Sequence, residues 1–143
     1  MKKVLAVGLV TLLVSLMPVV PASATAPQHF SLVKVCDYAP DECGVQDATG
    51  PFAVLKGGVV KYLGPNVGTP NAHGLLKINS EVLLVSADGN STLSGHFVFS
   101  GDQGHFTLYD GKGALTGITA QGSIGTISWE GWLFSLDGVY FDR

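Results

Sequence analysis

Residues 95–108 read Gly-His-Phe-Val-Phe-Ser-Gly-Asp-Gln-Gly-His-Phe-Thr-Leu, which is two alternating segments joined by a Gly-Asp pair. A glycine-led pair between alternating segments is typical of a two-residue β-hairpin turn. With that pair as the turn, Phe97 lies opposite Phe106, and Leu108 shares their face. Cross-strand aromatic pairs stabilise antiparallel strands by about 0.2–1 kcal/mol relative to an alanine pair. We therefore predict a hairpin whose phenylalanine face is part of the core.

The opposite face of this hairpin carries two histidines, His96 and His105, as diagonal neighbours. Such neighbours lie about 7–8 Å apart on adjacent strands. One interpretation is a two-histidine site for acid–base chemistry near neutral pH or for a metal ion. The other is a solvated polar face, which an alternating antiparallel strand usually has. We favour the surface pair and predict no metal site, because the sequence places no carboxylate beside them.

Alternating or short apolar segments continue along the rest of the chain, and no apolar period of 3.6 residues persists for three helical turns. Turn-forming glycine, asparagine, aspartate and proline residues separate the segments. The predicted fold is all-β, a small antiparallel eight-stranded barrel, because closure removes exposed edges; a β-sandwich is the alternative. The predicted strands are residues 30–35, 52–62, 75–85, 92–99, 104–109, 114–123, 126–134 and 139–141.

Glycine makes up about 15% of residues 25–143, roughly twice its average usage of about 7%. Residues 110–122 read Asp-Gly-Lys-Gly-Ala-Leu-Thr-Gly-Ile-Thr-Ala-Gln-Gly. This pattern resembles the repeated glycines of the allene oxide cyclase-like and dirigent-like barrels, with Lys112 where that pattern has threonine. The resemblance covers roughly residues 92–125. It implies a closed eight-stranded barrel with an apolar interior, a fold used by cyclases acting on apolar ligands and by exported proteins.

The chain begins with a short cationic stretch, Lys2 and Lys3, followed by 17 uncharged and mostly apolar residues and then Pro-Ala-Ser-Ala at 21–24. These three parts predict a signal peptide over residues 1–24, of a bacterial type, with cleavage between Ala24 and Thr25. An uncleaved membrane anchor is the alternative, although the apolar run is at the short limit for a bilayer span. The expected product is one secreted domain, residues 25–143, outside the cytoplasm in the periplasm or medium.

Two cysteines, Cys36 and Cys43, lie seven positions apart. In an exported chain such a pair is expected to form a disulfide. A zinc site is the weaker interpretation, because structural zinc sites use four ligands. Loss of the signal lysines leaves 6 basic and 11 acidic side chains, a net charge of −5 in place of −3. Without a basic cluster, nucleic acid and, after cleavage, a membrane surface are not expected partners.

Two groups of polar residues are candidates for ligand binding. Asn79 and Glu81 share one face of the strand predicted at residues 75–85. We expect that face to be solvated; if it lined the interior, the two side chains would form an acid–amide pair able to polarise a ligand. Glu130 lies between two tryptophans, and burial would raise its pKa so that it could act as an acid. Asn90 begins an Asn-Ser-Thr glycosylation acceptor pattern.

From these features we expect an exported β-barrel that binds an apolar small molecule, or that acts as a non-catalytic extracellular module, without a cofactor. Small eight-stranded barrels fill their interior with side chains or hold one ligand. A cofactor-free cyclase or isomerase of the allene oxide cyclase-like type is one alternative. A cell-surface or matrix interaction protein that uses exposed aromatics near Trp129 and Trp132 is another. The sequence leaves the oligomeric state open.

Overall fold

The computed structural model describes residues 26–39, 42–70 and 76–143. The predicted signal peptide and its Ala24–Thr25 cleavage site lie outside these residues. Within the described part of the chain, no helix combines the length and apolarity needed to cross a bilayer.

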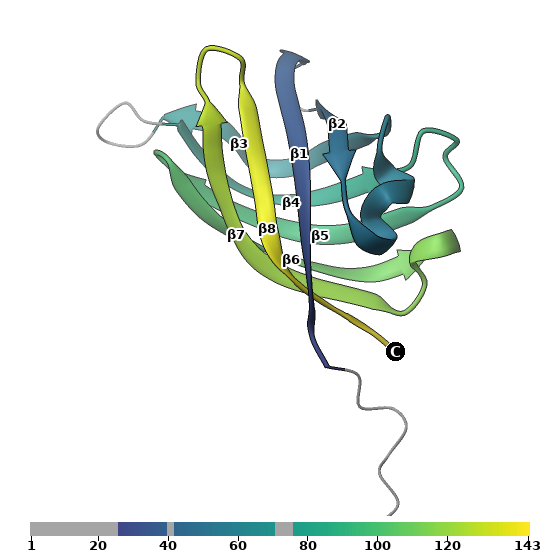
Figure 1. Cartoon of the computed structure of the whole chain (residues 1–143). Coiled ribbons are helices and arrows are strands. Elements are labelled where there is room, and N and C mark those ends of the chain that lie inside the picture. The colour runs from purple at the N-terminus through teal and green to yellow at the C-terminus, as the bar shows by residue number, and fades with distance from the viewer. Residues whose placement is uncertain (1–25, 40–41, 71–75) are drawn as a thin grey trace, which may run out of the picture.

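The described residues form a closed antiparallel barrel in which each strand pairs with the next in sequence, and the last strand closes against the first (Figure 1). The predicted eight-stranded barrel is therefore confirmed. The strands are β1 (Gln28–Ala39), β2 (Glu42–Ala48), β3 (Val59–Pro70), β4 (Leu76–Val85), β5 (Thr92–Ser100), β6 (Gln103–Lys112), β7 (Ile118–Ser128) and β8 (Leu133–Asp142).

The register of the β5–β6 hairpin is the one predicted from the sequence. Phe97 pairs with Phe106, and His96 pairs with Thr107. Both phenylalanines are buried, and their rings meet edge to face with centroids 6.2 Å apart. The two-residue turn and the alternation of apolar residues thus agree on one register, because a slip of either strand by one residue would turn its phenylalanine to solvent.

The second predicted strand, residues 52–62, is wrong in its first half. Residues Gly50–Leu55 form a 3-10 helix, η2, and β3 begins only at Val59. Gly50 and Gly57 adopt positive φ angles of 62° and 84°, which are turn conformations open to glycine. The helix lies at one end of the barrel (Figure 1), and its buried residues are Phe52 and Leu55. A strand that the sequence did not indicate, β2, takes the missing place in the barrel.

The predicted break at residues 124–125 is also wrong, because β7 is continuous and ends in a turn at residues 129–132. The short 3-10 helix η3 (Gly113–Leu115) precedes it. The predicted strands at 126–134 and 139–141 imply a turn between them, but Asp137 and Gly138 from that interval lie inside β8, where Gly138 pairs with Gly122. A Cβ atom on Gly122 would lie 2.5 Å from the Gly138 Cα atom. These glycines let two strands approach closely within the sheet rather than ending it.

Aromatic rings pack against one another near both ends of the barrel. Near η2, the Phe30 and Phe52 rings stack with centroids 4.0 Å apart, and Tyr140 meets both edge-on. At the opposite end, Phe134 packs edge-on with Trp129 of the β7–β8 turn, at 5.4 Å. Among the described buried residues, Lys34 is the one with a charged side chain, and it lies at the centre of the candidate site.

Candidate functional site

Lys34 is a lysine in the interior of the barrel. Side chains alternate along β1, so Lys34 faces the same side as Phe30 and Leu32, and only 3% of its surface is exposed. It pairs with Val45 on β2 and with Phe134 on β8, so the barrel encloses it from both sides. Lysine is among the residues least often fully buried without a partner.

Three aromatic rings surround the Lys34 amine. The Nζ atom lies 4.6 Å from the centroid of Phe134, 5.5 Å from Tyr62 and 6.0 Å from Phe97. The negative face of an aromatic ring attracts a cation, by about 2 kcal/mol where water is excluded. The rings thus offset part of the cost of burying the charge and present an apolar lining around it.

The predicted disulfide between Cys36 and Cys43 is present and joins β1 to β2 beside this amine. Lys34 Nζ donates to Cys36 Sγ at 3.3 Å and lies 3.8 Å from Cys43 Sγ. Sulfur is a weak acceptor. Among the described side chains, no carboxylate forms an ion pair with Lys34. Burial accordingly lowers the pKa of the amine to about 7, so much of it is uncharged and nucleophilic at neutral pH.

Tyr62 adds a second buried polar group to the same interior. Its hydroxyl is fully covered and has no hydrogen-bond partner among the described residues. Burial raises the pKa of this phenol well above its ordinary value, so the hydroxyl keeps its proton. Its ring packs edge-on against Phe97, with centroids 5.9 Å apart. Because buried polar groups are almost always paired, this unpaired hydroxyl is an exception among the described residues.

The predicted polar residues Asn79, Glu81 and His96 come together on the outer face of the barrel, so the expectation that no carboxylate lies beside the histidines is wrong for His96. His96 Nδ1 lies 2.7 Å from Glu81 Oε1, and its Nε2 lies 2.8 Å from Asn79 Oδ1. Tyr109 donates its hydroxyl to Glu81 Oε2 at 2.9 Å. The hydrogen bond from His96, and next that from Tyr109, hold the pKa of Glu81 below its ordinary value.

This outer cluster is arranged as a cross-strand contact rather than as an acid–base pair. Both ring nitrogens of His96 are occupied, so the ring has no nitrogen left for a substrate proton. Glu81 and Asn79 are exposed, whereas the acid–amide pair required by the cyclase alternative would lie inside. The structure thus brings together three of the predicted residues on the face that we expected to be solvated.

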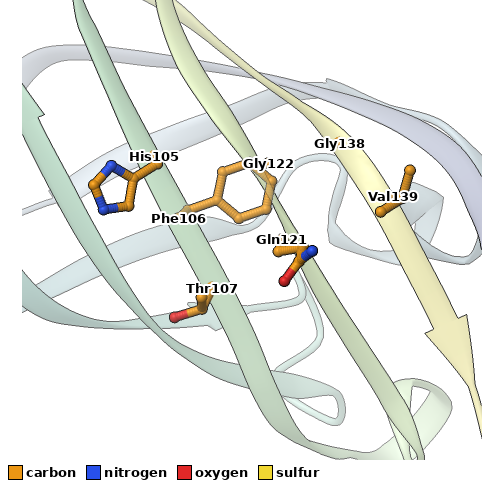
Figure 2. A pocket seen from close by; sticks show the side chains of 7 residues that line it. All are labelled: His105, Phe106, Thr107, Gln121, Gly122, Gly138 and Val139. Atoms are coloured by element: carbon orange, nitrogen blue, oxygen red, sulfur yellow. The ribbon is translucent and has the colours of Figure 1, made fainter.

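His105 lies apart from this cluster, at a shallow hollow on the outer face (Figure 2). The hollow encloses about 460 Å³ and is lined by side chains of β6, β7 and β8. Gly122 and Gly138 leave the surface low, and Figure 2 shows the Phe106 ring beside them. His96 is bound to residues of β4, so the two histidines do not share a ligand-holding arrangement. The hollow is lined by His105, Phe106, Thr107, Gln121, Gly122, Gly138 and Val139.

The remaining predicted residues lie in exposed turns. Glu130 is exposed in the β7–β8 turn, together with Trp129 and Trp132, which are 40% and 44% exposed. Asn90 is exposed in the turn between β4 and β5. Across residues 26–39, 42–70 and 76–143, no group of three or more histidine, cysteine, aspartate or glutamate side chains could hold a metal ion.

No protein-family model, curated protein or solved structure matches this chain. The support for the candidate site therefore comes from its geometry alone, and the allene oxide cyclase-like resemblance stays a prediction. Sequence reasoning missed both interior polar residues. The available signal was the alternation itself, which gives Lys34 the inward position of Phe30 and Leu32 and gives Tyr62 that of Val60.

Proposed function

We propose that the protein is an exported binding protein for an apolar small molecule with one polar end, held inside the barrel beside Lys34 and Tyr62. The observation that supports this most is the buried amine of Lys34, whose polar contacts are two disulfide sulfurs. Burying a lysine to this extent costs several kcal/mol, and strongly perturbed groups cluster at functional sites.

The lining suggests the chemistry of the ligand. Tyr62, Phe97 and Phe134 offer ring faces and edges, which suit an apolar body. Lys34 and the unpaired Tyr62 hydroxyl both donate hydrogen bonds, so the polar end of the ligand should be an oxygen acceptor. A ligand of this kind needs no cofactor to bind.

The proposed location follows from two separate features. The Cys36–Cys43 disulfide is compatible with an oxidising compartment. The signal peptide predicted over residues 1–24 would carry the chain to such a compartment.

The proposal can be tested by adding cinnamyl alcohol to the purified protein and following backbone amide signals by two-dimensional NMR. We expect saturable shifts at Tyr62, Phe97 and Phe134, and weaker binding by Lys34→Met and Tyr62→Phe. Lys56→Met is the matched control, because Lys56 is exposed and pairs with Asp47 on the surface. Shifts confined to the outer hollow around His105, or no shifts, would contradict an interior site.

A further inference from the structure

We propose that Lys34 captures an apolar aldehyde or ketone inside the barrel by forming an imine with its carbonyl carbon. The inference rests on the proposed function, because the carbonyl compound must first enter the aromatic interior. It goes further by assigning the polar end of the ligand to one chemical class and by making the attachment covalent.

Three features of the geometry favour imine formation. Lys34 is 3% exposed, and its amine donates to two sulfurs, which are weak acceptors and leave the nitrogen lone pair of the neutral amine available to an electrophile. The rings of Phe134, Tyr62 and Phe97 lie within 4.6–6.0 Å of Nζ and give the amine apolar surroundings, against which the body of the carbonyl compound would pack. The Tyr62 hydroxyl is a proton donor without a partner among the described residues, and it would bind the carbonyl oxygen.

The reaction balances without any further reactant. The uncharged Lys34 nitrogen attacks the carbonyl carbon, and a proton moves from nitrogen to the carbonyl oxygen to give a carbinolamine. The carbinolamine then loses its hydroxyl group and the second amine proton as one water molecule, and the carbon–nitrogen double bond forms. Water returning to the site would reverse the reaction, so a covered position favours the imine.

A carbonyl compound suits the site better than a carboxylate does. A carboxylate would be held by an ammonium ion, and the described neighbours of Lys34 that favour that charged form are the ring faces and two weakly accepting sulfurs. Desolvation instead favours the neutral amine, which is the form that adds to a carbonyl.

The test is reductive trapping with trans-cinnamaldehyde and sodium cyanoborohydride near neutral pH, followed by peptide mass spectrometry. Reduction fixes the imine as a secondary amine that carries the mass of the aldehyde less one oxygen atom. We expect Lys34 to be labelled about tenfold faster than the exposed Lys56, because the interior holds the aldehyde against the amine. Tyr62→Phe should slow labelling of Lys34 several-fold, and Lys34→Met should remove the fast label while NMR shows an intact fold.

Cinnamyl alcohol separates failure of this inference from failure of the proposed function, since it has the same apolar body and no carbonyl group. Interior binding of the alcohol with fast labelling of Lys34 by the aldehyde supports both. Interior binding of the alcohol without label on Lys34 overturns the imine and leaves the binding function. Equal labelling of Lys34 and Lys56 overturns the imine. Absence of interior binding by both compounds overturns the imine and the proposed function together.

Discussion

Lys34 should make the stability of the barrel depend on pH in a direction opposite to that of an ion-paired lysine. Its pKa is about 7 in the folded protein, whereas an unfolded chain keeps the proton to about 10.4. Between these values the unfolded state binds more protons, so the free energy of unfolding rises with pH. From about pH 7 to about pH 9 the rise should reach roughly 2–3 kcal/mol.

Lys34→Met tests this dependence, because methionine keeps much of the stem and has no titrating amine. The variant should be more stable than the parent protein below about pH 7 and should lose the alkaline rise. Urea unfolding measured at several pH values provides the comparison. Lys56→Met should keep the rise, since Lys56 is 63% exposed. Equal slopes for Lys34→Met and the parent protein would show that Lys34 is not the cause.

Glu81 provides a second prediction at the scale of the residue. Its pKa is held down by hydrogen bonds from His96 and from Tyr109. Tyr109→Phe should therefore raise the pKa of Glu81 toward its ordinary value, measured from carboxyl carbon shifts in NMR. A carboxyl group whose pKa is lower in the folded protein stabilises the fold at pH values above its unfolded-state pKa. That stabilisation is lost as the pH falls through the folded-state pKa. The variant should thus lose less stability in acid than the parent protein. An unchanged Glu81 titration would show that the Tyr109 bond is absent in solution.

At the scale of the strand, the contact between β7 and β8 depends on glycine at particular positions. A Cβ atom on Gly122 would lie 2.2 Å from the Asp137 carbonyl oxygen, whereas one on Gly125 in the same strand would meet only Ser135 Oγ at 3.6 Å. We expect Gly122→Ala to destabilise the protein by about 2 kcal/mol or more and Gly125→Ala to change stability by about 0.5 kcal/mol or less. Chemical unfolding of both variants is the measurement. Equal effects would mean that the two strands can separate at no cost.

Glycine has several structural roles, and this decides which elements could be predicted from the sequence. The β5–β6 hairpin was predictable because its turn pair and its alternation require one register. Residues 50–55 were not, because an apolar run bounded by glycines fits a strand and a short buried helix equally well. Asp137 and Gly138 have the composition of a turn, yet they lie in β8 because glycine also serves where two backbones approach closely.

At the scale of the whole molecule, closure of the barrel was predictable, whereas the interior site was not. Eight alternating segments require closure or stacking to cover their edges, and that argument uses no single residue. The position of Lys34 depends instead on which face of β1 is interior. Its separation from water depends on residues of β2, β3, β5 and β8 that lie around it. Such a combination of distant strands is a property of the closed barrel and has no local sequence pattern.

The seam between β2 and β3 is the narrowest pairing in the described barrel, with three residue pairs, from Glu42 with Lys61 to Gly44 with Val59. The Cys36–Cys43 disulfide fastens β2 to β1 on the other side of that strand. We expect the double variant Cys36→Ser, Cys43→Ser to lose about 2–3 kcal/mol of stability, because a cross-link constrains the unfolded chain. We also expect the disulfide to hold β2 in the folded barrel, where its pairing with β3 is short.

Hydrogen exchange should show which strands are destabilised when the disulfide is removed. Amides of β2 should lose protection first, while those of β5 and β6, which pair along most of their length, should exchange only with global unfolding. An equal loss of protection in β2 and β5 would show that the disulfide acts on the unfolded state alone and not on the seam. If β2 does open, water reaches Lys34, its pKa should rise toward the ordinary lysine value, and fast labelling by cinnamaldehyde should disappear with the disulfide. Loss of the label in the double variant would thus show that imine formation at Lys34 requires a closed seam between β2 and β3.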